Sequence, residues 1–204
     1  GKTTLFALAS GFLRPDAGSI AFDGEEITGA PPHLNARRGM TRTFQVVQPF
    51  AAQTVRENIA VGAHLHCADR REALAQAEAV AQRVGLSPVL DKPAGELTVA
   101  GRKRLELARA LATRPRLLLL DEVLAGLNPQ EVGEMVPVVR AIAAGGVTVL
   151  MIEHVMQAVM HLAQHVWVLA QGRLIASGTP AEVTRDPAVI EAYLGHGTAR
   201  RLAA

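Results

Sequence analysis

The chain opens on residue types that suit phosphate chemistry. Gly1-Lys2-Thr3-Thr4 matches the last four positions of the pattern G-x-x-x-x-G-K-[ST]. In such a loop, successive backbone N–H groups and the first turn of the following helix hold phosphate oxygens. The Lys2 ammonium would reach the β and γ phosphates of a nucleotide, and the Thr3 hydroxyl would take a ligand position on Mg²⁺. Taken alone, these four residues are equally compatible with an ordinary helix start.

Two adjacent carboxylates, Asp121 and Glu122, follow the apolar run Leu117–Leu120. Four leucines in a row are typical of a strand buried on both faces of a parallel sheet, and ligands bind beyond the carboxyl ends of such strands. Asp121 can there face a magnesium ion held by phosphates, and Glu122 can polarise the water that attacks the γ-phosphate. Polar residues also follow many structural strands, but the Gly-Lys-Thr upstream favours the catalytic interpretation.

Val147–Ile152 is predicted to be a second strand that is buried on both faces. His154 follows this strand, so it should lie at the same edge of the sheet as the acidic pair. A lone histidine after a strand is usually a surface residue. Because this histidine follows the acidic pair in chain order, we interpret it as a sensor of the γ-phosphate.

Six motifs occur in order along nearly the whole chain: GKTT, TFQ, a segment ahead of ARAL, LLLLDE, AGLNP and EH. This order resembles the ATP-binding subunits of ABC transporters. The stretches TRTFQ, LDEVLAGLNPQE and IEHVM, with the ending GTPAEVTRDPAVIEAYLG, are similar to the subunit that serves branched-chain amino acid importers. Related importers carry urea or short amides, so those substrates stay open.

The resemblance implies a role for each matching residue. Gln45 corresponds to the loop glutamine that touches Mg²⁺ and links the nucleotide to a helical insert, Glu122 to the catalytic carboxylate and His154 to the switch histidine. The loop that ends at Asn128 would cross to a partner subunit. The residues implied to contact ATP are Gly1, Lys2, Thr3, Thr4, Gln45 and Asp121, of which Thr3, Gln45 and Asp121 would hold the Mg²⁺.

The signature segment departs from the family pattern. ABC subunits work as head-to-tail dimers, in which each ATP lies between one chain's phosphate loop and the other chain's signature segment. Where the family reads LSGGQ, alignment on ARAL gives LTVAG: Thr98 keeps the hydroxyl, but Val99 and Ala100 replace the two glycines that allow close backbone approach. A one-position shift that uses Gly101 stays open. We therefore expect a heterodimer with a related ATPase subunit that carries an intact signature.

The resemblance also implies the architecture, an α/β fold with a P-loop NTPase (RecA-like) core, a small antiparallel β subdomain and an inserted α-helical subdomain. We expect a single ABC ATPase domain over residues 1–204, in which 1–50 and 113–204 form the core and 51–112 the helical insert with the signature segment. We also expect an N-terminal truncation, since the family's adenine-stacking aromatic residue and the first half of the phosphate loop would precede Gly1. Val123 stands where the family usually has proline.

Local patterns agree with this architecture. Ser19–Asp23 alternates apolar and polar residues, as a half-buried strand does. Asp69–Val84 has helical spacing and ends at Gly85. Asn128 is the expected N-cap of a further helix, within which Pro137 predicts a kink.

Composition limits the remaining choices. Of the 204 residues 49% are hydrophobic and 20% charged, which is typical of a packed globular protein. The single cysteine, Cys67, excludes an internal disulfide. No apolar run approaches the roughly 20 residues that a membrane helix needs. The family resemblance then implies a peripheral protein on the cytoplasmic face of the inner membrane, docked on permease subunits and acting indirectly with a substrate-binding protein.

Two other residue clusters have simpler interpretations. His64, His66 and Cys67 are metal-ligand types, but residues two apart on a helix point to different faces, so we interpret them as structural. The basic residues carry no interleaved aromatics, which argues against nucleic-acid binding and favours solvated faces or the signature helix itself. These residues are Arg37, Arg38, Arg42, Arg102, Lys103 and Arg104.

Two rival functions come from other classes. A non-transport ABC ATPase of DNA repair or translation would usually carry tandem domains, long insertions or strongly basic arms. A P-loop phosphotransferase of small molecules would lack the helical insert ahead of the acidic strand. Co-purification with a membrane permease would separate these rivals from an importer subunit.

Overall fold

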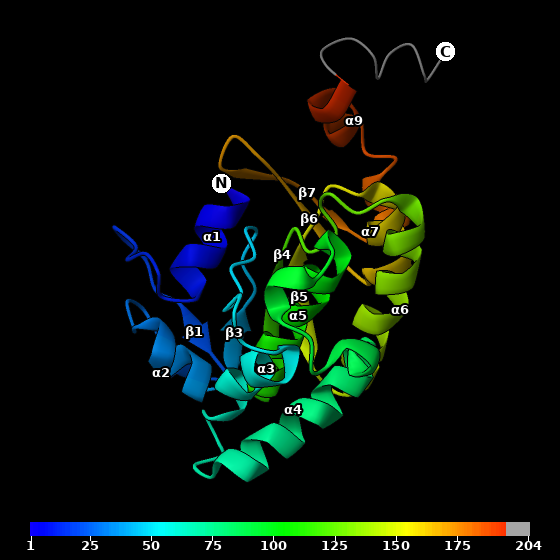
Figure 1. The fold of residues 1–204 in the computed structure, drawn as a ribbon. Helices are drawn as coiled ribbons and strands as arrows, with labels where there is room; N and C mark the ends of the chain where they lie inside the picture. The colour runs from blue at the N-terminus through cyan, green and yellow to red at the C-terminus, as the bar shows by residue number, and fades with distance from the viewer. Residues whose placement is uncertain (195–204) are drawn as a thin grey trace.

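The computed structural model describes residues 1–194, and Figure 1 shows their helices packed around a small central sheet. The sheet holds three parallel strands in the order β3-β4-β5. Their bounds are β3 Met40–Arg42, β4 Leu117–Asp121 and β5 Thr148–Ile152. None of the helices in the described part of the chain has the length and apolar character that crossing a membrane requires.

The register of the sheet places the predicted site residues at one edge. Asp121, the last residue of β4, pairs with Ile152, the last residue of β5. The two strands therefore end side by side, and the residues that follow them, Glu122 and Glu153, leave the sheet at the same edge. This confirms that the acidic pair and the histidine segment converge.

The two apolar strands differ in burial. Leu118, Leu119 and Leu120 of β4 are at most 1% exposed, as predicted for a strand covered on both faces. In β5 only Ile152 is buried, so the prediction that this strand is buried throughout was wrong. The reason is its position, since β5 has a hydrogen-bonded neighbour on one side only within residues 1–194.

Three helices form the insert, and they confirm the helical pattern of the sequence. Their bounds are α3 Val55–Ala63, α4 Arg70–Val84 and α5 Val99–Ala112, with 3₁₀ turns at Ser87–Val89 and Ala94–Glu96 between the last two. Each helix packs on the other two, and Figure 1 shows α4 at the end of the molecule opposite the N-terminus. A Cβ at Gly62 would clash with the carbonyl oxygen of Arg109, so α3 and α5 approach each other backbone to backbone.

Two short antiparallel sheets flank the core. The first is shorter than the predicted strand, because only Ala21–Phe22 (β1) pairs with Glu25–Glu26 (β2) around a turn that contains Gly24. The second joins β6 (Val166–Ala170) to β7 (Arg173–Gly178).

Six further helices complete the described chain, of which α8 and α9 pack on the β6-β7 hairpin. They are α1 Lys2–Ala9, α2 Pro32–Arg37, α6 Pro129–Ala144, α7 Met156–Leu162, α8 Pro180–Val183 and α9 Pro187–Leu194. Asn128 caps α6 as predicted, and its side chain accepts a hydrogen bond from the backbone N–H of Glu131. The helix continues through Pro137, where the kink stays a prediction.

Two hydrophobic clusters connect these layers. The larger one runs without interruption from the insert through β4 to α6, which makes the insert and the core one packed body. The smaller one lies under α1, where Phe6 packs with Met40 of β3, Leu119 of β4 and Ile152 of β5. Through Phe6, helix α1 packs against all three strands of the central sheet.

Candidate active site

The backbone turns sharply where β4 ends. Glu122 has a φ of 50°, a left-handed conformation that costs a residue other than glycine of order 1–3 kcal/mol. Its N–H donates to the carbonyl oxygen of Ile152 at 3.0 Å, which ties the turn to the end of β5. Strained backbone of this kind persists only where surrounding contacts hold it, and it is frequent at active sites.

The Glu122 carboxylate meets two of the predicted site residues. The Gln45 side chain donates from Nε2 to Glu122 Oε2 at 2.7 Å, although the two residues are 77 positions apart. His154 Nδ1 lies 3.9 Å from Glu122 Oε1, close enough for an ion pair when the imidazole is protonated. The Glu122 side chain is 23% exposed and that of His154 57%, so both remain open to a ligand from solvent. The structure therefore brings Gln45, Glu122 and His154 together.

Asp121 lies one residue earlier and is fully buried. Its Oδ2 accepts a hydrogen bond from Nη2 of Arg42 at 2.7 Å, and its backbone N–H donates to the hydroxyl of Thr43 at 3.2 Å. The other carboxylate oxygen, Oδ1, is buried without a hydrogen-bond partner in the described structure. That oxygen retains free lone pairs, which suits a ligand position on a hard cation or on its water.

Arg42 is a site residue that the sequence analysis missed. Only 7% of its side chain is exposed, so its interpretation as part of a solvated basic face was wrong. Its guanidinium lies 6.0 Å from the centre of the Phe6 ring and 5.5 Å from that of Phe44, both cation–π distances. Arg42 thus connects α1, the glutamine loop and Asp121. Its alternation with buried Met40 along β3 could have indicated an inward position.

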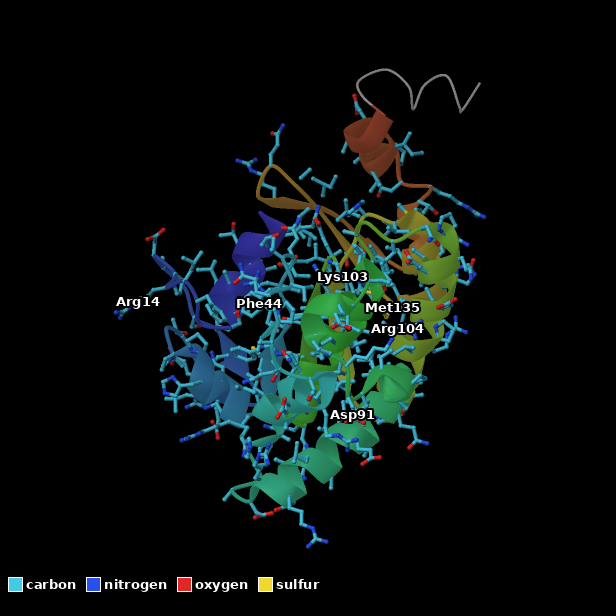
Figure 2. All side chains as sticks on the ribbon, in the orientation of Figure 1. Arg14, Phe44, Asp91, Lys103, Arg104 and Met135 are labelled. Atoms are coloured by element: carbon cyan, nitrogen blue, oxygen red, sulfur yellow. The ribbon has the colours of Figure 1, made fainter. Side chains whose placement is uncertain are left out.

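Lys103 is the second buried cation at this edge. Of the two interpretations of its basic run, a solvated face or the signature helix itself, the structure supports the second, because Lys103 lies in α5. It is 7% exposed, and its Nζ donates to the carbonyl oxygens of Gln45 at 3.2 Å and Glu122 at 3.1 Å. Burial lowers the pKa of Lys103, and the nearby carboxylates, Glu153 first among them, partly offset that shift. Figure 2 labels Lys103 together with its neighbour Arg104, which pairs instead with Glu134 of α6.

Two further carboxylates near this edge are held in poorly solvated positions. Burial raises the pKa of Glu106, against the opposing effect of Arg109 and of the Phe44 N–H. Burial likewise raises the pKa of Glu153, whose Oε1 accepts from the Leu124 N–H at 2.9 Å. In both cases the leading cause is the loss of solvation, which disfavours the charged form of the carboxyl.

The predicted phosphate-loop residues form the start of α1. Gly1 is the N-cap position, and Lys2, Thr3 and Thr4 are exposed in the first turn. Lys2 precedes Phe6 by four residues, so both occupy the same face of α1, and Phe6 packs in one hydrophobic cluster with residues of all three strands. Lys2 also lines a small cavity that it shares with Glu153. Lys2 is therefore near Glu153, the residue that follows β5, while Thr3 and Thr4 remain exposed to solvent.

The signature segment forms the start of α5. Thr98 is the N-cap and accepts a hydrogen bond from the Gly101 N–H at 3.2 Å, while Val99 is 58% exposed. A Cβ at Gly101 would meet Leu97 and Thr98 of its own segment. The first turn thus presents Val99 to solvent, and Gly101 packs against residues that precede it.

The histidine and cysteine cluster has contacts of another kind. His64 Nδ1 lies 3.0 Å from the Cys67 carbonyl oxygen, and His66 Nε2 lies 2.9 Å from that of Thr113. Cys67 is buried, and its Sγ donates to Gln76 Oε1 at 3.2 Å. The two imidazoles therefore bond different parts of the backbone.

Comparison with known families identifies two matching regions. Residues 1–125 match the family described as ABC transporter. Residues 173–199 match the family described as Branched-chain amino acid ATP-binding cassette transporter.

Curated relatives match over nearly the whole chain. The high-affinity branched-chain amino acid transport ATP-binding protein BraF of Pseudomonas aeruginosa is 41% identical, over 96% of this chain and 83% of its own length. The protein LivG of Escherichia coli, which bears the same description, is 36% identical over 96% of this chain and 83% of its own length.

Solved structures show the same fold. A nucleotide-free ATP-binding cassette from an ABC transporter superimposes with a TM-score of 0.85 at 31% identity, over 96% of this chain and 84% of that chain. The ADP conformation of an ATP-binding cassette of an ABC transporter gives the same TM-score, 0.85, also at 31% identity, over 96% of this chain and 84% of that chain. These neighbours confirm the predicted α/β P-loop architecture, and the relatives confirm the family resemblance.

Proposed function

Because this chain belongs to the ATP-binding proteins of ABC transporters, which hydrolyse ATP, we propose that it drives a membrane permease that imports branched-chain amino acids. The substrate class rests on the names of the relatives and on the second family match. The observation that carries the ATPase proposal is the Glu122 carboxylate at the end of β4, bonded to Gln45 and close to His154.

Each of these three side chains has a distinct part in the proposal. Glu122 polarises the attacking water and accepts its proton, since it is a partly exposed carboxylate beyond the end of a buried strand. Gln45 holds one oxygen of that carboxylate, which leaves the other free for water. His154 senses the γ-phosphate from the opposite side of Glu122, and it is exposed enough to donate a hydrogen bond to it.

The start of α1 would hold the phosphates. Gly1, Lys2, Thr3 and Thr4 provide backbone N–H groups, one ammonium and two hydroxyls at the positive end of a helix. Thr3, Gln45 and Asp121 fit a magnesium site by chemistry, because they offer a hydroxyl, an amide and the unpartnered Oδ1 of a buried carboxylate. Bound Mg²⁺ would neutralise charge on the phosphates.

The domain boundaries and partners form part of the same proposal. Residues 1–50 and 113–204 make the nucleotide-binding core, and 51–112 make the helical insert, in one ABC domain. The subunit works on the cytoplasmic face of the membrane, where ATP closes a dimer of ATPase subunits and hydrolysis reopens it. The permease subunits are its direct partners, and a substrate-binding protein acts through them.

We propose that the second ATPase subunit is a different chain with an intact signature segment. In this chain Val99 projects a branched side chain from the first turn of α5, where a backbone N–H should approach the partner's ATP. Asn128, exposed at the start of α6, would cross to the partner on the other side. The site built from this chain's Lys2, Gln45, Glu122 and His154 would be the active one, and the opposite site would be weak.

The test uses the assembled transporter with full-length subunits. Glu122→Gln in this subunit should lower ATP turnover on the order of 10²- to 10⁴-fold while ATP still binds. The corresponding glutamate-to-glutamine change in the partner subunit should lower ATP turnover only slightly.

Each part of the proposal has its own contrary result. Turnover within about threefold of wild type for Glu122→Gln would remove this residue from the mechanism. Equal losses from the two subunits would contradict the asymmetry and leave the ATPase assignment standing. Transport of urea or short amides, with no branched-chain amino acid transport, would correct the substrate.

A further inference from the structure

Lys103 occupies an unusual position between two functional segments. It lies in α5, five positions after the Thr98 cap, and it reaches back to the end of β4. Lysine is rarely this deeply buried, because its ammonium loses hydration and its side chain loses rotamer freedom. A compensating set of contacts must therefore hold it there.

The hydrogen bonds of Lys103 connect it to both Gln45 and Glu122, which also bond each other. The ammonium donates to the backbone carbonyl oxygens of Gln45 and Glu122. The side chains of the same two residues bond each other, from Gln45 Nε2 to Glu122 Oε2. Lys103 thus fixes the backbones of both partners of the carboxylate hydrogen bond at once.

One of the two residues whose backbone accepts a hydrogen bond from Lys103, Glu122, has a strained backbone conformation. Glu122 has a φ of 50°, and its N–H bonds the Ile152 carbonyl while its carbonyl accepts from Lys103. The two bonds anchor the same residue from opposite ends, one to β5 and one to α5. Without the second anchor, the strained turn could relax and carry the carboxylate with it.

We propose that Lys103 is a positioning residue that fixes the Glu122 carboxylate against Gln45 and links it to helix α5. The inference rests on the proposed function, in which Glu122 acts on the attacking water. Because the signature segment is the first turn of α5, Lys103 also connects that segment to the catalytic carboxylate of the same chain. A displacement of α5 would therefore move the backbones of Gln45 and Glu122.

Arg104, the next residue, supplies a matched control. It is also a partly buried cation on α5, and it also donates to a backbone carbonyl, that of Val84. Its second partner is Glu134 of α6, and neither of these contacts involves Gln45 or Glu122. Arg104→Met removes a comparable cation from the same helix and leaves the contacts of Glu122 intact.

The experiment compares Lys103→Met, Lys103→Arg and Arg104→Met in the assembled transporter, with full-length subunits. Lys103→Met should lower kcat for ATP on the order of 10- to 100-fold, because small displacements of a catalytic group have effects of that size. KM for ATP should stay within about threefold, since Lys103 acts on the carboxylate rather than on the nucleotide. Lys103→Arg should recover part of kcat, because a guanidinium can donate to both carbonyls. Arg104→Met should keep kcat even where it lowers thermal stability.

A second comparison separates this inference from the function it rests on. In a Glu122→Gln background, Lys103→Met should cause little further loss, because two residues that act as a unit are non-additive. Full turnover in Glu122→Gln alone would overturn the proposed function. A large loss in Glu122→Gln with unchanged kcat in Lys103→Met would overturn only the role of Lys103. Equal kcat losses in Lys103→Met and Arg104→Met would also overturn it, by showing that any buried cation on α5 matters in the same way.

Discussion

The helical insert and the carboxyl edge of the central sheet satisfy their polar groups in different ways. In the insert each helix start is capped from within its own first turn, by Thr54, Asp69 and Thr98, each of which accepts from a backbone N–H three residues on. At the sheet edge the partners are distant in sequence, 79 positions apart for Arg42 and Asp121 and 77 for Gln45 and Glu122.

The two regions also differ in how completely these groups are satisfied. The insert core consists of small and aliphatic side chains with closed caps. The sheet edge retains a positive φ at Glu122, an unpartnered Asp121 Oδ1 and a Glu153 carboxyl whose pKa burial raises. Such unfavourable features are tolerated where the chemistry needs them. The difference indicates that the starts of the insert helices are satisfied locally, whereas the sheet edge keeps strained and unpartnered groups of the kind that active sites retain.

Removing the buried cation Arg42 at the sheet edge should therefore lower the free energy of unfolding far more than removing the exposed cation Arg70 in the insert. Arg42→Met leaves the buried Asp121 carboxylate without its 2.7 Å partner, and we expect a loss of about 3–5 kcal/mol in the free energy of unfolding. Arg70→Met breaks the exposed 3.5 Å pair with Glu57 in the insert, and we expect at most about 1 kcal/mol. Urea unfolding of the purified subunit measures both values.

A double variant keeps this prediction testable if Arg42→Met folds poorly. Replacing Asp121 with Asn as well removes the uncompensated charge, so Arg42→Met/Asp121→Asn should be more stable than Arg42→Met alone. Similar losses in Arg42→Met and Arg70→Met would remove the distinction between the regions.

A smaller effect should follow from opening one cap in the insert. Asp69→Ala removes the acceptor for the Glu72 N–H, 2.9 Å away, which should lower the free energy of unfolding by about 1 kcal/mol. Asp69→Asn keeps an acceptor and should stay close to wild type. Because no hydrogen bond or ion pair among the described residues joins α4 to Gln45, Glu122 or His154, ATP turnover should be unchanged in both variants. A turnover defect in Asp69→Ala alone would show that the insert and the site are more tightly connected than these contacts indicate.

The same contrast explains what could be predicted from the sequence. The cap at Asp69, the left-handed Gly85 and the helical spacing between them act over a few residues, so α4 was predicted almost to its ends. The leucine run of β4 was predicted with its burial, because four consecutive leucines leave no polar face. Gln45, Glu122 and His154 were predicted as site residues from motif order, and the structure brings their side chains close together.

The missed features depend on distant parts of the chain. Nothing near Arg42 indicates that its partner stands 79 positions later, and a short basic run usually faces solvent. Lys103 did carry a weak indication, because Leu107 and Ala110 lie four and seven positions further along and share its buried helical stripe. The partial exposure of β5 depends on which strands lie beside it, and a strand's own residues do not specify its neighbours.

The smallest expected effect is a difference in the sign of pH dependence between the two regions. Burial raises the pKa of Glu153 above its ordinary value of 4.5, so the folded state binds that proton more tightly than the unfolded state does. Relative to Glu153→Gln, the wild type should therefore lose stability as pH rises from 4.5 through the raised pKa.

In the insert, hydrogen bonds from Thr54 lower the pKa of Glu57, so the pH dependence of stability has the opposite sign. Relative to Glu57→Gln, the wild type should be more stable above pH 4.5 and lose that advantage as pH falls through the lowered pKa. Urea unfolding of the three proteins from acid to neutral pH measures both differences, and two slopes of the same sign would contradict this contrast.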